Sequence, residues 1–215
     1  EVTQELFQLD RTFEIIPNSI DVAKFVKDDS ITVEENTILY FGTLIRKKGL
    51  LELPLIFNEV VKQNPRAKLI LIGRDAADVI SGSHSTWSMM QPLFTEAAAK
   101  QVTYLGSVPY AEIAQHINAA TVCVFPTFAE ALPVSWIEAM AMQKAIVASD
   151  IGWAKEVIED NTNGFLVNPK AHSLYATKIL QLLEDEKLRQ EFGLQAREKV
   201  LHKFSIAVVA QQSVD

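Results

Sequence analysis

The chain has 215 residues and 48% hydrophobic content, which is enough for one ordinary domain with a packed core. Its 20 Lys and Arg against 27 Asp and Glu give a net charge of -7, which argues against a general nucleic-acid binder and leaves room only for a local basic site. A single cysteine, Cys123, excludes a disulfide framework, and no apolar run approaches the roughly 18 residues that span a bilayer, so we expect a reducing, cytoplasmic setting.

Short β-rich apolar runs alternate along the chain with longer segments of helical periodicity. The runs that predict strands cover residues 37–43, 67–73, 101–106, 121–126, 144–149 and 164–167. The segments that predict helices cover residues 49–64, 85–100, 110–120, 132–143, 153–160 and 172–185, the second of them begun or interrupted by Pro92. This alternation is typical of an α/β protein.

The predicted strands are apolar at successive positions rather than at alternating ones, as in LILIG at 69–73 and VCVFP at 122–126. Strands with this pattern are covered on both faces. The sequence therefore predicts a doubly wound, Rossmann-like α/β domain over residues 37–200, with a mostly parallel sheet and helices on both faces.

The two ends of the chain differ from this domain. Residues 1–36 contain one strand candidate at 13–17 and then a turn-rich, acidic stretch, which we interpret as a linker. Residues 201–215 have the pattern of the start of a C-terminal helix. Because the first residue is Glu1 rather than Met and the last residues continue a helical pattern, we expect a fragment of a longer protein.

The loops that follow the strands carry the candidate binding residues, because open parallel sheets bind ligands beyond the carboxyl ends of their strands. These loops open at Gly42-Thr43, Gly73-Arg74-Asp75, Gly106-Ser107-Val108, Pro126 to Glu130 and Ser149-Asp150. Glycine at such a place favours either close approach of the backbone to a ligand or simply a tight turn. Neither a GxGxxG fingerprint nor a P-loop motif is present, so a dinucleotide dehydrogenase and a P-loop NTPase lack their best evidence.

Two stretches have the composition of a phosphate site. Arg46, Lys47 and Lys48 follow a predicted strand in an otherwise acidic chain, although a solvated turn explains three cations equally simply. The second stretch precedes Pro133, since proline at the first helical position marks a helix start whose free N–H groups and dipole attract anions. Proline has no N–H to offer, and the expected donors are Ala131, Leu132 and Val134.

Two glutamates, Glu130 and Glu138, frame this helix start in FAEALPVSWIEAM. Glu130 has a simple explanation, since an acidic residue near a helix N-terminus stabilises the helix dipole by roughly 0.3–1 kcal/mol. Glu138 lies in a segment that is apolar nearly all round, which is typical of a buried helix. An ionised carboxylate there is costly unless a Lys, an Arg or the hydroxyl groups of a ligand pair with it. With eight residues between them, the two carboxylates can point into one crevice from different depths.

In this setting the sequence resembles the carboxyl-terminal, donor-binding domain, one half of the GT-B fold, of the family-four-like retaining glycosyltransferases. The resemblance runs through EIIPNSIDVAKF (14–25), ILYFGTLIRKKGL (38–50), AKLILIGR (67–74), VTYLGSVPYAEIAQ (102–115) and the stretch from AATVCVFP to GFLV (119–167). It therefore covers nearly the whole chain. Its most specific element is the E-x7-E motif of Glu130 and Glu138, which means little alone but is a strong signal within this ordered set.

The resemblance implies a role for each of these residues. Glu138 would hydrogen-bond the ribose hydroxyls of a nucleotide, and Glu130, the catalytic candidate, would contact hydroxyls of the donor sugar near the reacting carbon. Lys48 and the backbone after Glu130 would hold the diphosphate and stabilise charge on the leaving group. The segment from Gly106 to Val108 would contact the base. The residues that would border the same crevice are Gly73 and Arg74.

Three positions depart from the family pattern. Thr43 stands where the family usually has arginine, so one phosphate clamp is either absent or supplied by Arg46. Ala131 replaces the glycine that is usual after the first glutamate, and Trp153 replaces the second of two glycines after Ser149-Asp150. These changes bear on the geometry of the donor site and on the choice of sugar.

The resemblance also implies what the rest of the protein does. Family members carry the acceptor site and a catalytic histidine in an amino-terminal domain, so this chain alone would bind a UDP-, GDP- or ADP-sugar without efficient transfer. The amino-terminal domain would be the partner of this chain, and the full-length enzyme would be a retaining, hexosyltransferase-like enzyme. It would bind no nucleic acid and need no cofactor or metal ion. Peripheral association with the inner face of the membrane is left open. No Asp-x-Asp stands in a suitable loop, and the four histidines are expected to be ordinary surface or packing residues.

Two other functions stay open. A GT-B nucleotide-sugar epimerase would use the same donor pocket without an acceptor sugar. A noncatalytic nucleotide-sugar-binding module would explain both Thr43 in place of the usual arginine and the lack of the amino-terminal domain in this chain. Calorimetry with UDP, GDP and ADP and with their sugars is expected to separate these functions.

Overall fold

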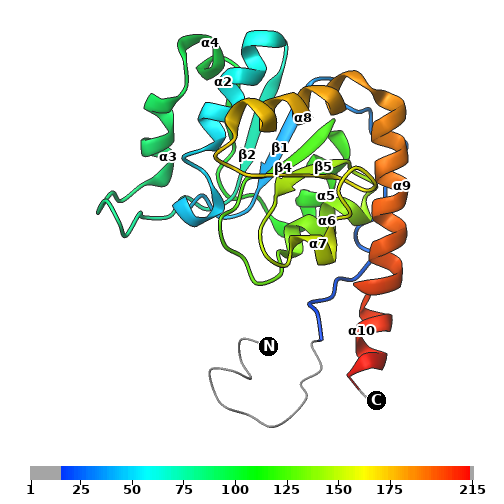
Figure 1. Ribbon diagram of the computed structural model, residues 1–215. Helices are drawn as coiled ribbons and strands as arrows, with labels where there is room; N and C mark the ends of the chain where they lie inside the picture. Colours follow the sequence, from blue (N-terminus) through cyan, green and yellow to red (C-terminus); the bar gives the residue numbers. More distant parts are fainter. Residues whose placement is uncertain (1–15, 214–215) are drawn as a thin grey trace.

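The computed structural model describes residues 16–213, and its centre is a six-stranded sheet (Figure 1). The strands are β1 (Thr37–Phe41), β2 (Lys68–Ile72), β3 (Val102–Tyr104), β4 (Val122–Phe125), β5 (Ile146–Ser149) and β6 (Phe165–Val167). Their order is β3-β2-β1-β4-β5-β6, and every neighbouring pair is parallel. The order reverses between β1 and β4, which is the switch point of a doubly wound fold. The predicted fold class is confirmed, and each of the six strands predicted within residues 37–200 is present.

Helices connect the strands and cover both faces of the sheet (Figure 1). In the described part of the chain the α-helices are α2 (Leu53–Gln63), α3 (Thr86–Met90), α4 (Glu96–Ala99), α5 (Tyr110–Ala119), α6 (Val134–Ala141), α7 (Ala154–Val157), α8 (His172–Glu184), α9 (Glu186–Lys203) and α10 (Ile206–Gln212). The 3-10 turns η1 (Arg46–Lys48) and η2 (Gln91–Leu93) precede α2 and α4. On one side of the sheet α2 packs against α8, and on the other side α6 packs against α9. No helix within residues 16–213 is long and apolar enough to cross a membrane.

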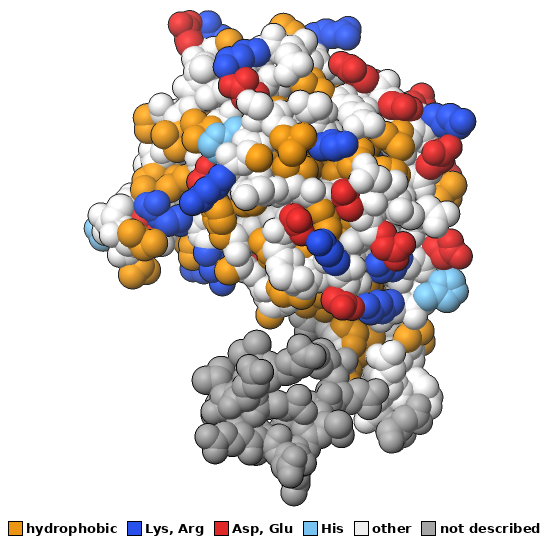
Figure 2. Space-filling model, viewed as in Figure 1, with side chains coloured by type: hydrophobic (Ala, Val, Ile, Leu, Met, Phe, Trp, Pro, Cys, Tyr) orange, Lys and Arg blue, Asp and Glu red, His pale blue; other side chains and the backbone are white. Residues whose placement is uncertain are grey.

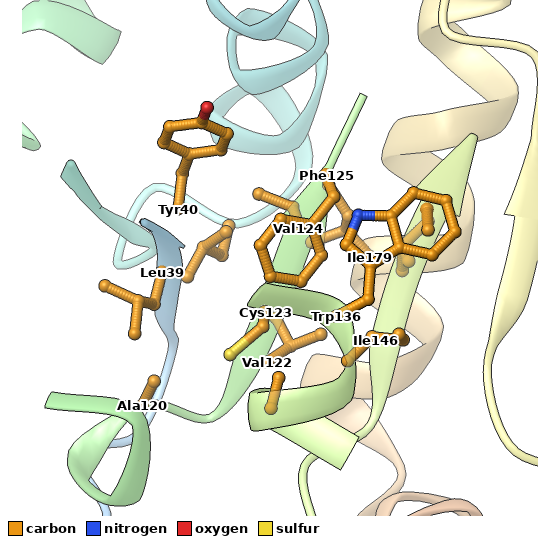
Figure 3. Close-up of a cluster of buried hydrophobic side chains, with 14 of the residues drawn as sticks. Leu39, Tyr40, Ala120, Val122, Cys123, Val124, Phe125, Trp136, Ile146 and Ile179 are labelled. Carbon is orange, nitrogen blue, oxygen red and sulfur yellow. The ribbon is translucent and has the colours of Figure 1, made fainter. Parts of the chain in front are cut away.

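The core is built from fully buried strands and a row of aromatic rings. Strands β1, β4 and β5 are buried along their whole length, as their successive apolar residues predict. The ring of Phe125 lies 6.2 Å from that of Tyr40 and 6.1 Å from that of Trp136, between ring centroids (Figure 3). The Trp136 ring in turn lies 5.4 Å from that of Trp153. The row therefore ties β1, β4, α6 and the start of α7 into one packed unit.

The structure changes several predicted helix boundaries, and the helix predicted at 153–160 is reduced to the single turn α7 (Ala154–Val157). Residues 85–100 form α3, η2 and α4, so the predicted interruption at Pro92 is confirmed, because proline has no N–H with which to continue the hydrogen-bond ladder. Pro133 lies at the N-cap of α6 with an extended backbone, rather than at the first helical position. The first helical N–H group therefore belongs to Val134.

The segment predicted as a linker packs onto the domain over part of its length. The strand candidate at 13–17 lies largely outside the described residues. Further along, Ile20 and Phe25 are buried in the core, and Ile20 forms a parallel bridge with Ser205. Residues 20–25 therefore belong to the packed body of the domain.

The C-terminal helix does not start where the sequence predicts. Position 201 lies inside α9, and the next helix, α10, starts at Ile206. The predicted boundary at 201 is corrected accordingly. The reason is that Val200, just before this position, and Phe204, at the C-cap of α9, are both buried, so α9 keeps a packed side up to its end at Lys203.

Candidate functional site

A cavity of about 500 Å³ opens at the carboxyl ends of β1 and β2, beside the start of α6. We name it the switch-point cavity, because it lies at the sheet edge where doubly wound folds bind ligands. Its walls come from η1, from the loop between β3 and α5, and from the loop that precedes α6. The predicted site residues that line it are Thr43, Lys48, Gly73, Arg74, Val108, Glu130, Leu132, Val134 and Glu138.

Three predicted site residues do not line this cavity. The guanidinium of Arg46 is held on the other side of η1, where its Nε and Nη2 donate to the Asp78 carboxylate at 2.8 and 2.7 Å. Gly106 contributes a carbonyl that accepts from the Gly73 N–H at 2.8 Å, and Ala131 lies exposed on its loop. Of the two alternatives for the arginine that is missing at Thr43, a clamp that is absent or one supplied by Arg46, this geometry favours the first, because Asp78 pairs with the Arg46 guanidinium.

Glu130 and Lys48 form an ion pair in the cavity wall. The Lys48 Nζ lies 3.0 Å from the Glu130 Oε1, and the two side chains are 23% and 16% exposed. Their approach depends on Gly49, whose φ is 74° and where an added Cβ would lie 1.8 Å from the Pro126 carbonyl oxygen. Only glycine therefore lets η1 come so close to the loop that carries Glu130.

The Glu130 loop is held in place by an indole ring. The Nε1–H of Trp153 donates to the Glu130 carbonyl, and the Trp153 ring packs on Trp136. Nearby, the buried Tyr40 hydroxyl donates to the Thr43 carbonyl at 3.0 Å. Burial, and then the Glu130 charge, raise the pKa of Tyr40 far above its usual range, so it stays a neutral donor. The departure from the family pattern at Trp153 thus has a structural role, which is to position the Glu130 backbone.

Glu138 is a nearly buried carboxylate, 4% exposed, on the second turn of α6. Within residues 16–213 no Lys or Arg pairs with it, and its partner is the Tyr110 hydroxyl, which donates to Oε1 at 2.5 Å. Burial raises the pKa of Glu138, and the Tyr110 hydrogen bond offsets part of that rise. Its second oxygen, Oε2, accepts no hydrogen bond from the described residues. Among the described residues the partner is therefore a phenol rather than the predicted Lys or Arg, and pairing with the hydroxyl groups of a ligand stays a prediction.

Tyr110 is the site residue that the sequence analysis missed. It begins α5, is 61% exposed, and its ring meets that of Phe25 edge-on at 5.9 Å between centroids. Burial and the hydrogen bond to Glu138 raise its pKa well above the usual range. The one available signal was its position just after the predicted base-contacting loop, and no local pattern links a tyrosine to a glutamate 28 residues away. Only the packing of α5 beside α6 brings the two together.

The charged groups of the cavity are suited to an anionic, polyhydroxylated ligand. Lys48 and Arg74 are its cations, and Arg74 is exposed and forms no ion pair with any described residue. Val134 and Ser135, in the first turn of α6, also line it, and the N–H groups of a first helical turn have no intrahelical acceptors. No group of three or more His, Cys, Asp or Glu side chains in the described part of the chain is arranged to hold a metal ion.

Comparisons with known proteins assign a family to this arrangement. A family model described as "Glycosyl transferases group 1" matches residues 21–199. Among curated proteins, the chain is 29% identical over 184 residues to an alpha-maltose-1-phosphate synthase of Mycolicibacterium smegmatis, which covers 83% of this chain and 46% of that protein.

Solved structures share the fold. A sucrose-phosphate synthase from Thermosynechococcus elongatus matches with a TM-score of 0.80 and 25% identity, over 94% of this chain and 51% of that one. Anabaena Alr3699/HepE, solved in complex with UDP and glucose, matches with a TM-score of 0.80 and 22% identity, over 94% and 55%. The chain spans about half the length of the curated relatives that it matches.

Proposed function

The chain belongs to the glycosyl transferases group 1 family, and from this premise we propose that it is the donor-binding half of a retaining glycosyltransferase. The donor is a nucleoside diphosphate sugar that occupies the switch-point cavity. The observation that carries this proposal is Glu138, a carboxylate only 4% exposed whose Oε2 has no partner among the described residues. Oε2 is not among the fully buried unpartnered atoms and Glu138 lines the cavity, so a ligand there can donate hydrogen bonds to this oxygen.

A ribose diol is the donor group that Glu138 is suited to accept. Two neighbouring hydroxyl groups can both donate to one carboxylate, and hydrogen bonds to an ionised acceptor are about twice as strong as neutral ones. Tyr110 holds Oε1 and so limits the rotation of the carboxylate. In this proposal Oε2 is therefore already oriented when the nucleotide enters.

The diphosphate then lies between Lys48, Arg74 and the start of α6. Lys48 and Arg74 supply positive charge, and the first turn of α6 supplies N–H groups and the positive end of its dipole. These groups stabilise the negative charge that grows on the leaving diphosphate as the glycosidic bond breaks. When Lys48 contacts the diphosphate, its ion pair with Glu130 weakens. The Glu130 carboxylate can then accept hydrogen bonds from hydroxyls of the donor sugar.

The loop between β3 and α5 is suited to the base. Val108 and Ile113 line the cavity there with apolar surface, and Ser107 adds a hydroxyl that can donate or accept. Gly106 has a left-handed φ of 71°, which shapes the turn without facing the cavity. The base therefore stacks on aliphatic side chains, and its polar edge meets Ser107 and the backbone.

The complete reaction requires more than this chain. The acceptor site and the remaining catalytic groups are proposed to lie in the other half of the full-length enzyme, so this chain binds the donor without efficient transfer. The full-length enzyme is proposed to transfer the sugar with retention, without a metal cofactor, and to associate peripherally with the inner face of the membrane.

Titration calorimetry tests the donor site directly. The chain is titrated with uridine, with UDP, GDP and ADP, and with the corresponding nucleotide sugars. One diphosphate series is expected to bind, and the nucleoside alone to bind more weakly, since it lacks the groups that Lys48 and Arg74 contact. If no nucleotide binds at millimolar concentration, the proposal fails. A different outcome is that the chain binds a nucleotide sugar but the full-length protein transfers no sugar to any acceptor. In that case the protein is a noncatalytic module or an epimerase instead.

A further inference from the structure

The loop between β2 and α3 projects from the molecule (Figure 1). It carries two adjacent aliphatic side chains that are exposed to water. Val79 is 94% exposed and its neighbour Ile80 is 80% exposed. Single exposed apolar residues are common on protein surfaces and need no explanation. Two adjacent ones on a loop that is rigidly built do need one.

Hydrogen bonds at the base of this loop hold the tip away from the core. The Asp78 carboxylate, on a residue 3% exposed, accepts two hydrogen bonds from Arg46 and one from the Ser81 N–H at 2.9 Å. The Asp78 N–H donates to the Ser83 carbonyl at 2.8 Å, and the two residues form an antiparallel bridge. Gly82 closes the turn with a left-handed φ of 75°. The loop is therefore a closed turn whose geometry presents Val79 and Ile80 to solvent.

Free positive charge lies beside the tip. A second cavity, of about 490 Å³, separates Val79 and Ile80 from Phe128, and Lys47 and Lys170 lie in its lining. Neither lysine forms an ion pair within residues 16–213, and the Lys170 Nζ lies 5.8 Å from the centroid of the Phe128 ring. Figure 2 shows hydrophobic side chains on the projecting loop at the left of the molecule, with Lys and Arg side chains beside them.

Each of the two acidic residues of this cavity has a partner within the protein. Asp78 is paired with Arg46, and the Glu52 Oε2 lies 2.5 Å from the His172 Nε2. The cations of the lining, Arg46, Lys47 and Lys170, outnumber its two carboxylates, although the chain as a whole carries -7. A local positive, apolar surface on an acidic protein is complementary to an anionic, apolar partner.

We propose that this loop-tip surface, formed by Lys47, Val79, Ile80, Phe128 and Lys170, docks on an anionic lipid bilayer. Two side chains on a convex tip are too small for a stable protein interface, which needs about 1,000 Å² or more. A bilayer accepts such a tip, because the aliphatic side chains enter the headgroup boundary while lysines contact lipid phosphates. The inference names a surface for the membrane association proposed above, but it does not depend on nucleotide binding, since none of these side chains lines the switch-point cavity.

Vesicle sedimentation of the 215-residue chain tests this docking. Vesicles of phosphatidylcholine alone are compared with vesicles that also contain phosphatidylglycerol, at low and at high salt. We expect binding only to the anionic vesicles and loss of binding at high salt. The double variant Val79→Ser/Ile80→Ser should lose binding. Each of Lys47→Gln and Lys170→Gln should weaken it roughly fivefold, as one lysine near an anionic surface predicts.

Matched variants elsewhere on the surface serve as controls. Leu194 is an exposed aliphatic residue on α9, 57% exposed, and Lys100 is an exposed lysine after α4, with 70% of its side chain exposed. Leu194→Ser and Lys100→Gln should bind anionic vesicles like the unaltered chain. Melting temperatures show that each variant is folded. Absence of binding by the unaltered chain, or equal binding by the Val79→Ser/Ile80→Ser variant, overturns the proposal.

A fluorescent label shows which residues enter the lipid. Because Cys123 is fully buried, a cysteine introduced by Val79→Cys takes a thiol label selectively, and Leu194→Cys provides the control position. An environment-sensitive dye should brighten with anionic vesicles only at position 79. Brightening at both positions, or at neither, contradicts docking through the loop tip. Concentration-dependent self-association that disappears in Val79→Ser/Ile80→Ser would identify a second copy of the chain as the partner and overturn the lipid proposal.

Discussion

Two cavities lie on opposite sides of η1, and the three consecutive cations of that turn are divided between them. Lys48 lines the switch-point cavity, whereas Arg46 and Lys47 line the second one. In a 3-10 turn, successive side chains point about 120° apart, so three adjacent cations cannot all face one ligand. The sequence composition therefore locates a basic turn, whereas the backbone conformation of η1 decides which cavity each cation lines.

Each cavity also contains one nearly buried carboxylate, and the two have opposite environments. Hydrogen bonds from Arg46 and then Ser81 hold the pKa of Asp78 well below its usual range. Burial raises the pKa of Glu138, whose sole described partner is the neutral Tyr110. The charge of Asp78 is thus compensated within the protein, while Glu138 keeps an oxygen available for a ligand. Both carboxylates are nearly buried, and what distinguishes Asp78 from Glu138 is that a cation of the protein pairs with Asp78.

Among the substitutions that test this difference between the two cavities, Glu138→Gln should have the largest effect on nucleotide binding. Nucleotide affinity should fall on the order of 10- to 100-fold, because hydrogen bonds to a charged group contribute about 1.5–3 kcal/mol. The melting temperature should stay the same or rise, since glutamine keeps an acceptor for Tyr110 without a buried charge. Calorimetry and thermal unfolding measure the two quantities. Glu52→Gln, in the second cavity, is the control, and a lower melting temperature with unchanged affinity would show that Glu138 is purely structural.

Lys48→Met should have the next largest effect. We expect roughly tenfold weaker binding of the nucleoside diphosphate, because one charge-assisted contact to phosphate is lost. Binding of the nucleoside alone should hardly change. The matched control is Lys47→Met, which alters the neighbouring cation on the other side of η1. Equal losses in the two variants would mean that both cations act through general surface charge, and the division between the cavities would lose its functional meaning.

Tyr110→Phe should weaken nucleotide binding by a smaller factor, roughly two- to tenfold. The variant keeps the ring that packs on Phe25 and removes only the hydroxyl that orients the Glu138 carboxylate. Calorimetry measures the loss. Tyr175→Phe removes a buried hydroxyl that donates to the Val147 carbonyl at 2.7 Å, away from both cavities, so it should lower stability without changing affinity. Tighter binding in Tyr110→Phe would instead show that Tyr110 competes with the ligand.

The smallest expected effect is a pair of opposite pH trends. The pKa of Glu138 is raised in the folded state above its ordinary value of 4.5, so the folded protein binds this proton more tightly than the unfolded chain. As the pH falls from neutral toward 4.5, Glu138 takes up its proton, the folded protein becomes more stable, and nucleotide affinity falls. The pKa of Asp78 is lowered from its ordinary 3.8, so its stabilisation is complete above that value and is lost at lower pH.

Measurements on Glu138→Gln isolate these trends. Melting temperature and affinity are followed from neutral pH down to 4.5, the ordinary pKa of the group, in the unaltered chain and in the variant. Their difference removes the titration of the nucleotide itself. The affinity of the variant should lack the part of the pH dependence that Glu138 contributes. Identical pH profiles for the two proteins would mean that Glu138 does not titrate in this window.

Much of the fold follows from local patterns. Successive apolar residues predict strands covered on both faces, and the structure places the six parallel strands within the predicted ranges. Helix boundaries are less accurate at 153–160, where only one helical turn forms, and at position 201, where α9 continues to Lys203. The edge of the sheet that carries the cavity was also predictable, because parallel strands all end at the same edge.

The sequence by itself determined the layered α/β architecture, the edge of the sheet at which the switch-point cavity opens, and the two glutamates of the E-x7-E motif, because these depend on the order and spacing of neighbouring residues. Only the tertiary structure decided that Tyr110 holds Glu138, that Arg46 anchors the Asp78 loop, and that Trp153 positions the Glu130 backbone. Each of these contacts joins residues far apart in the chain. Their partners are set by how helices and loops pack across the sheet, and no local periodicity encodes that packing.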